Sequence, residues 1–176
     1  MSLRYALLAA IDETPSTGYA LTRRFNEGLA HVWSANHQQV YRELARLEKE
    51  GLLSVTVESQ AGKPDRKRYA ITAAGIEALG AWVEQIAARP ATRDPLLVKL
   101  FAGDLVSSPR LCAELDTHRQ TWREQLATYR AIEARYFADP DTLSHRYRLQ
   151  YLALRRGILN TESWLAWADE VQAVLA

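Results

Sequence analysis

The sequence has few of the residues from which catalytic or metal sites are built. A single cysteine, Cys112, among 176 residues excludes an internal disulfide and a metal cluster made of cysteines alone. The four histidines include no pair spaced i, i+4, and no Gly-rich phosphate loop or nucleophile motif occurs. We therefore predict that the protein is not an enzyme and holds neither a metal nor a cofactor.

Long hydrophobic runs and an excess of one charge are also missing. No apolar stretch approaches the ~20 residues that span a bilayer, and the first residues lack the pattern of a signal peptide. Lys and Arg number 22 against 21 Asp and Glu, a formal net charge of +1. We expect a soluble, cytoplasmic protein in which any nucleic-acid binding depends on local patches.

Two prolines close together, Pro90 and Pro95, separate two regions with strong helical periodicity. The chain is therefore predicted to form two lobes, residues 1–88 and residues 89–176. The predicted fold class is mostly α.

The first lobe is predicted to contain three helices, a β-hairpin and a fourth helix, with no strand before the hairpin. The hairpin strands are the β-branched segment 52–58 and the segment 66–71. In the third helix, Ser34 is the expected N-cap and Gly51 marks the end. Its expected buried stripe is Val40, Leu44 and Leu47, and that of the fourth helix is Ile76, Leu79, Val83 and Ile86.

The second lobe is predicted to be entirely helical. Asp94 and Pro95 open a short helix that is expected to run over 96–106. A long apolar seam over 111–136 follows, on which His118 is expected to be buried, and then a last long helix. Two long helices in so short a chain need a further surface to cover them, so we infer a homodimer.

Three helices followed by a hairpin are the element order of a winged helix-turn-helix, whose third helix enters the DNA major groove. The start of the third helix and its outward side are rich in groups that contact bases. They are Ser34, Asn36, His37, Gln38, Gln39, Arg42 and Arg46. Alone, such a series is typical of a solvated helix face.

The expected wing concentrates positive charge. Between residues 59 and 70 the chain has four cations and one acid, a net charge of +3 against +1 for the whole chain. The cations are Lys63, Arg66, Lys67 and Arg68. Alone, a basic turn is typical of a solvated loop, but together with the polar helix it favours DNA binding.

The sequence resembles the PadR family of bacterial transcriptional regulators. The resemblance is carried by the motifs TGYAL at 17–21, VYRELARLEKEGLL at 40–53, GKPDRKRYAITAAG at 62–75 and DPLLVKLF at 94–101, and by the region of Arg156, Gly157, Ile158 and Trp164. It implies a winged helix with a helical dimerisation domain. It also implies a homodimer, usually a repressor, that binds an inverted repeat and is in some members released by a small aromatic effector.

The resemblance also implies roles for particular residues. Tyr19 would meet a phosphate, and the groove would be contacted by Asn36, His37, Gln38 and Tyr41. Lys63, Arg66 and Arg68 would serve the wing. For Tyr41 two alternatives remain open, since at 100° from Val40 it can support the core or contact phosphate.

The five tryptophans offer aromatic faces to a planar effector, and we single out Trp122 and Trp164 as candidates. The alternative for these residues is packing in the core or at a dimer interface. For the whole protein, the alternative to a regulator is a protein-interaction module built on a winged helix. Replacing the four wing cations with alanine distinguishes the two, because only DNA binding depends on them.

Overall fold

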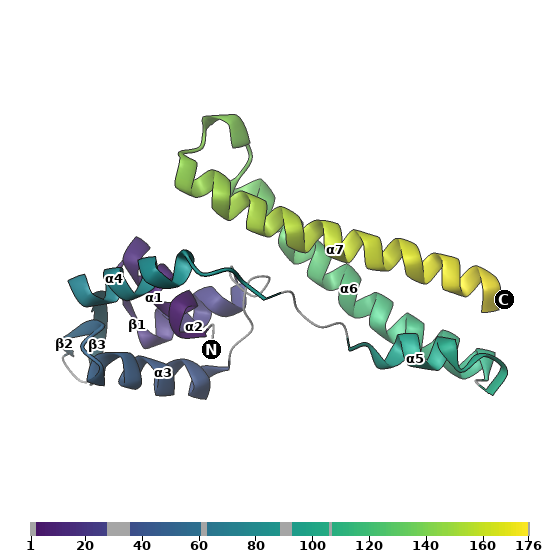
Figure 1. Cartoon of the computed structure of the whole chain (residues 1–176), viewed down its shortest axis with the longest axis horizontal. Helices are drawn as coiled ribbons and strands as arrows, with labels where there is room; N and C mark the ends of the chain where they lie inside the picture. Colours follow the sequence, from purple (N-terminus) through teal and green to yellow (C-terminus); the bar gives the residue numbers. More distant parts are fainter. Residues whose placement is uncertain (1–2, 28–35, 61–62, 89–92, 106, 176) are drawn as a thin grey trace. The chain divides into compact units, whose positions relative to one another are not determined.

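The structure of the chain is a computed structural model that describes residues 3–27, 36–60, 63–88, 93–105 and 107–175 (Figure 1). The chain divides into two compact units, Met1–Ala88 and Arg89–Ala176. The described part contains seven α-helices and a three-stranded sheet. The mostly α fold class is confirmed. None of the described helices is both long enough and apolar enough to cross a membrane.

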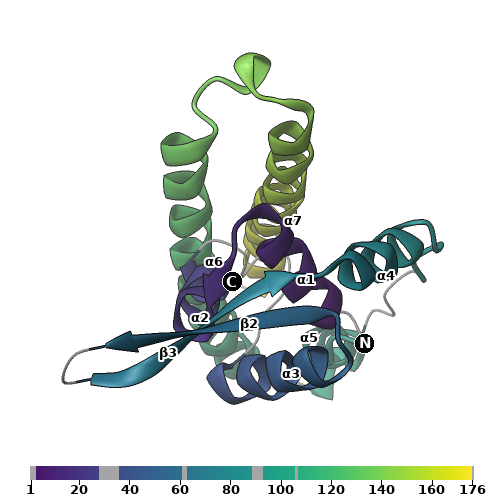
Figure 2. The same ribbon diagram turned by 90° about the vertical axis from the view of Figure 1, so that its left-hand side faces the viewer.

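The first unit is a winged helix. Its elements in chain order are α1 (Leu3–Glu13), β1 (Ser16–Thr17), α2 (Gly18–Glu27), α3 (His37–Lys49), β2 (Leu53–Gln60), β3 (Lys63–Ile71) and α4 (Ala73–Val83). Strands β2 and β3 form the long antiparallel hairpin of the wing, which extends beyond the helices of the unit (Figure 2). The wing was predicted from the β-branched segment 52–58 and the segment 66–71 that follows it.

Strand β1 corrects the prediction that no strand precedes the hairpin. It consists of two residues and pairs antiparallel with β3, with Ser16 opposite Tyr69 and Thr17 opposite Arg68, so the strand order is β1-β3-β2. So short a strand has no periodicity to detect, because its hydrogen bonds depend on a segment about fifty residues later. It anchors the base of the wing to the start of α2.

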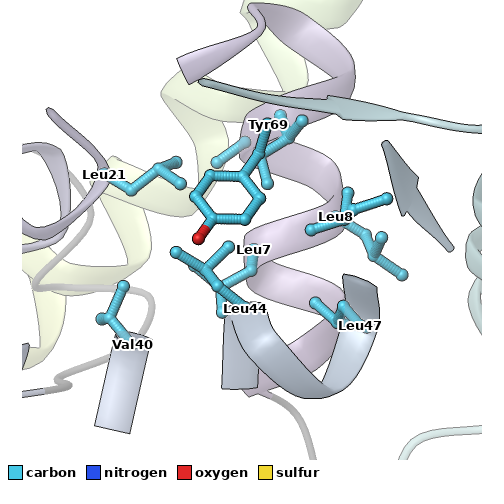
Figure 3. Close-up of a cluster of buried hydrophobic side chains, with 10 residues drawn as sticks. Leu7, Leu8, Leu21, Val40, Leu44, Leu47 and Tyr69 are labelled. Carbon is cyan, nitrogen blue, oxygen red and sulfur yellow. The ribbon is translucent and has the colours of Figure 1, made fainter. Parts of the chain in front are cut away.

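Helices α1, α2 and α3 and strand β3 enclose one apolar core. In Figure 3 the ring of Tyr69 lies among aliphatic side chains from all three helices. Those labelled there are Leu7, Leu8, Leu21, Val40, Leu44 and Leu47. Burial raises the pKa of Tyr69 above its ordinary value. The stripe predicted for the third helix is confirmed, and it fixes which face of α3 points outward.

The start of α3 differs from the prediction. Asn36, not Ser34, is the N-cap, and Ser34 lies outside the described residues. Asn36 is the cap because Gln39 follows three residues later, and the side chains of these two residues form a reciprocal capping box. The end of α3 follows the prediction, since Gly51 has a φ of 73°, the left-handed conformation that glycine adopts without strain.

Helix α4 is much less covered than its periodicity predicted. Within α4 only Gly75 is buried, and its backbone packs so closely on Leu52 that an added Cβ would lie 2.3 Å from the Leu52 backbone oxygen. Ile76, Val83 and Ile86 are exposed within the described part of the chain, with Ile86 at 99%. The prediction that they form a buried stripe is therefore wrong for this unit. A periodic pattern identifies the apolar side of a helix but not what covers it.

The second unit is helical throughout its described residues, apart from turns. It consists of α5 (Pro95–Phe101), the short 3₁₀ turn η1 (Gly103–Leu105), α6 (Ser108–Tyr136), the turn η2 (Pro140–Thr142) and α7 (His145–Leu175). Asp94 caps α5 as predicted, since its Oδ1 accepts a hydrogen bond from the Leu96 N–H at 2.9 Å. The helix is shorter than the predicted 96–106, because it ends at Phe101 and Gly103 follows with a φ of 58°.

Helices α6 and α7 lie side by side and antiparallel (Figure 1). Buried leucine, isoleucine and tyrosine side chains join them, and one charged group lies among these. The guanidinium of Arg119 on α6 is almost fully buried, 3.0 Å from Asp116 on its own helix and 3.0 Å from Asp169 on α7. The prediction for His118 is wrong, because its side chain is about half exposed.

Candidate nucleic-acid interface

The outward face of α3 is polar and begins at the capping box. The N–H of Gln39 donates to Asn36 Oδ1 at 2.9 Å, and the N–H of Asn36 donates to Gln39 Oε1 at 3.0 Å. Because Val40 and its helical repeats point into the core, the residues between them point out. The exposed side chains along α3 include His37, Gln38, Gln39, Arg42 and Arg46. This is the face that was predicted to meet the groove.

Tyr41 connects α3 to the start of α2. A Cβ added to Gly18 would lie 2.7 Å from the Tyr41 ring, so the tyrosine rests directly on the Gly18 backbone. The ring of His37 stacks on Tyr41 at a centroid distance of 4.3 Å. Tyr41 is still 38% exposed, so it supports the α2–α3 contact and also reaches the surface. Its contact with phosphate stays a prediction.

Helix α2 begins beside this pair. The N–H of Ala20 donates to Thr17 Oγ1 at 3.2 Å, which makes Thr17 the cap of α2. Tyr19 in the first turn of α2 is 66% exposed. The TGYAL motif therefore supplies a cap, a glycine that admits Tyr41, and an exposed tyrosine at the predicted phosphate position.

The C-terminal end of α3 is linked to α1 by an ion pair. Glu50 accepts a hydrogen bond from Arg46 at 2.9 Å and pairs with Arg4. These hydrogen bonds, that from Arg4 first, lower the pKa of the Glu50 carboxyl. Arg46 is therefore already paired with Glu50 within the protein, and it would have to leave this partner to bind another anion. The i, i+4 spacing of Arg46 and Glu50 was a sequence signal for this pair, whereas the contact with Arg4 depends on the tertiary fold.

Two of the four predicted wing cations are already paired with carboxylates. Lys67 lies 3.3 Å from Glu48 of α3, and this pair links the wing to α3. Arg68 donates to Glu58 at 2.5 Å and to the backbone oxygen of Pro15 at 3.2 Å. The hydrogen bond from Arg68 lowers the pKa of Glu58. Sequence reasoning missed both acidic partners.

Arg66 differs from these neighbours. It is exposed on β3 and has no hydrogen bond or ion pair within the described residues, although it lies opposite Glu58 in the hairpin and its charge, after that of Arg68, lowers the pKa of that carboxyl. Lys63 is the first residue of β3, opposite Gln60, and its side chain lies outside the description. Arg42 on α3 is likewise exposed and unpaired within the described residues. Within the described residues, Arg42 and Arg66 are therefore free to bind an anion without first breaking a hydrogen bond to a carboxylate.

The candidate effector residues Trp122 and Trp164 lie in the second unit. Their rings stack at a centroid distance of 5.4 Å, and His118 and Trp167 meet Trp164 edge-on. Of the other tryptophans, Trp82 stacks on Tyr5 in the first unit, and Trp33 lies outside the described residues.

Two open hollows occur in the second unit, of about 270 and 580 Å³. Neither is lined by Trp122 or Trp164. The first is lined by Leu100, Trp167, Glu170, Val171, Val174 and Leu175, and the second by Arg130, Glu133, Ala134, Phe137, Ala138, Pro140 and Tyr151.

The chain matches two family descriptions, "Transcriptional regulator PadR-like family" over residues 7–81 and "Virulence activator alpha C-term" over residues 92–176. It is also 37% identical to the probable transcriptional regulator Rv1176c of Mycobacterium tuberculosis, over 99% of this chain and 98% of that one. The chain belongs to the PadR family of transcriptional regulators.

Solved PadR-family structures agree with the fold described above. The virulence activator AphA of Vibrio cholerae superposes with a TM-score of 0.82 at 37% identity, over 99% of this chain and 98% of that chain. PadR of Bacillus subtilis, solved in complex with operator DNA, superposes with a TM-score of 0.81 at 23% identity over the full length of both. These comparisons confirm the family and the winged-helix fold inferred from the motifs.

Proposed function

We propose that this PadR-family protein is a homodimeric DNA-binding repressor that recognises a pseudo-palindromic operator. The observation that carries the proposal is the outward polar face of α3, with Arg42 and the wing residue Arg66 unpaired in the described structure. The complex of Bacillus subtilis PadR with operator DNA supports it. The protein acts by binding, not by chemistry, in the compartment that holds the DNA, the cytoplasm.

In this proposal α3 enters the major groove and the wing lies along the flanking backbone. Asn36, His37, Gln38 and Gln39 are at the leading end of α3, the end that enters the groove, and Asn36 and Gln39 also form the capping box that holds this end. Tyr19 and Tyr41 contact phosphate beside them. Lys63, Arg66, Lys67 and Arg68 neutralise phosphates from the wing and release counterions.

The second unit supplies the dimer contact. Leu149, Leu152 and Leu159 on α7 are each about half exposed or more, and they share one side of the helix at spacings of three and seven residues. Leu154 and Ile158 on the opposite side are fully buried against α6. Helix α7 therefore has two apolar sides, of which α6 covers one. A second copy of the chain covers the other, because an isologous contact satisfies both copies at once.

A dimer of winged helices presents two α3 helices to successive turns of the same DNA face. Their half-sites are then about 34 Å apart, and the operator is an inverted repeat. We assign repression because occupying a promoter suffices for it, whereas activation needs a further contact with the polymerase. The description of Bacillus subtilis PadR as a negative transcriptional regulator supports repression. AphA, in contrast, is described as a virulence activator.

The proposal predicts preferential binding to DNA upstream of the protein's own gene. Purified protein, titrated against a fluorescent upstream fragment and against random DNA of equal length, should bind the upstream fragment at least a hundredfold more tightly. Two protomers should bind each site, and affinity should fall steeply between two salt concentrations. Equal binding to both fragments would contradict sequence-specific recognition. Transcript levels that fall when the regulator is deleted would contradict repression.

An aromatic acid is the proposed effector, and Trp122 and Trp164 are its proposed contacts. Bacillus subtilis PadR has been solved with p-coumaric acid, which supports this class of ligand. Both tryptophans are only partly buried, so each keeps surface available to a planar ring. Binding there would alter the α6–α7 pair and, through it, the separation of the two recognition helices.

Replacing Trp122 or Trp164 with alanine should weaken p-coumaric acid binding about tenfold, the contribution of one lost aromatic contact. Calorimetry on variants shown to remain dimeric measures this directly. Trp82→Phe is the control, because Trp82 stacks on Tyr5 in the first unit and should leave the affinity unchanged. Wild-type affinity in both alanine variants would place the effector elsewhere.

A further inference from the structure

The exposed polar side chains of α3 differ in whether their hydrogen-bonding groups are already engaged. The amide oxygens of Asn36 and Gln39 both accept backbone N–H groups in the capping box. Arg46 donates to Glu50 at 2.9 Å. The first two side chains hold the start of the helix, and the third is tied to its end.

Gln38 and Arg42 are not engaged in this way. Both are exposed, and neither has a hydrogen bond or ion pair within the described residues. They stand two residues before and two residues after the buried Val40, so each lies about 160° from it around the helix. Four residues apart, they share one side of α3 and are separated by about 6 Å along its axis.

Recognition of adenine by a side-chain amide needs both its oxygen and its NH₂ group. Glutamine or asparagine recognises adenine when its oxygen accepts from N6 and its NH₂ group donates to N7. An amide oxygen turned back to a helix N–H is held by that bond, so Asn36 and Gln39 cannot freely present their oxygen and NH₂ group together to one base edge. Gln38 has both groups available. Arg42 has the free guanidinium that pairs with O6 and N7 of guanine.

We propose that Gln38 and Arg42 are the specificity-determining pair of this protein, with Gln38 reading an adenine and Arg42 a guanine in each half-site. Asn36 and Gln39 position the helix instead of reading bases. The 6 Å separation corresponds to about two base-pair steps of 3.4 Å, so the two bases lie close together. The assignment rests on the proposed DNA-binding function and adds the chemistry of its target.

Selection from a random double-stranded DNA library tests it, with the full-length wild-type protein and four variants. Wild type should enrich a half-site that contains adenine and guanine within about two positions of each other. Gln38→Glu should replace the adenine preference with cytosine, whose N4 amine donates to a carboxylate. Arg42→Ala should lose the guanine preference. Each discrimination should change roughly five- to 150-fold, the range for one bidentate contact.

Two matched controls distinguish the loss of a base contact from the effect of the changed net charge. Gln39→Glu adds the same negative charge one residue away, and glutamate preserves the capping box, so base preference should stay that of wild type. Arg46→Ala removes the same positive charge as Arg42→Ala, and it should also keep the wild-type preference. Circular dichroism and melting curves establish that all four variants are folded.

The outcomes distinguish this assignment from the function on which it rests. If the wild-type protein enriches no sequence, the proposed function falls and the assignment with it. If wild type enriches a site but Gln38→Glu keeps its adenine, or Gln39→Glu alters the preference as much as Gln38→Glu does, the function stands and the assignment is wrong. A shift confined to the Gln38 and Arg42 variants supports both.

Discussion

Replacing Leu152 and Leu159 of α7 with glutamate should convert the protein from a dimer to a monomer. Both leucines are more than half exposed in the single chain. The substitutions therefore weaken apolar packing only where a second copy covers these side chains. Fully burying a leucine contributes roughly 1.5–3 kcal/mol, and a symmetric dimer buries the exposed half of four such side chains, about 3–6 kcal/mol together. The dimer dissociation constant should therefore rise by about a hundredfold or more, as measured by analytical ultracentrifugation.

The monomer produced in this way should remain folded, because the buried side of α7 is unchanged. Its affinity for a complete operator should fall to that for a single half-site, since two half-sites no longer bind one molecule. Ala127→Glu is the control: Ala127 is exposed on α6 and lies outside the leucine stripe, so this variant should stay dimeric. A double glutamate variant that remains dimeric would place the subunit contact on another surface.

The parts of the fold predicted from the sequence are those determined by local patterns. The buried stripe of α3 repeats at helical spacing, and the first strand of the wing is rich in β-branched residues, so both were identified correctly. The capping box of Asn36 and Gln39 was also visible, as a polar residue followed three positions later by glutamine. Ser34 was nevertheless predicted as the N-cap, and the reciprocal hydrogen bonds of Asn36 and Gln39 show that this prediction is wrong.

The features that were missed depend on contacts between distant segments. Strand β1 exists only because β3 lies beside it. The pairing of Lys67 with Glu48 and of Arg4 with Glu50 joins residues that no spacing rule connects. Such contacts between distant segments matter more for the candidate site than for the fold. The sequence identified the polar residues of α3 and the wing, but only the structure separates those already paired from those available to DNA.

Replacing Arg66, Lys67 and Arg68 of β3 with alanine should lower operator affinity at least a hundredfold near physiological salt. Each cation that neutralises a phosphate contributes about 0.9 to the slope of log affinity against log salt, so six removed from a dimer lower the slope by up to about five. Arg66 should account for the largest single share. Lys67 and Arg68 must first leave Glu48 and Glu58 to reach a phosphate, and they gain correspondingly less.

A second triple variant removes the same charge from the other unit. Arg110, Arg123 and Arg135 are exposed on α6, and their replacement with alanine should leave the salt slope unchanged, because α6 is not part of the proposed DNA surface. Titration of both variants across a range of salt concentrations makes the comparison. If the wing variant keeps the wild-type affinity and slope, the wing does not bind phosphate, and the protein is better described as an interaction module on a winged-helix scaffold.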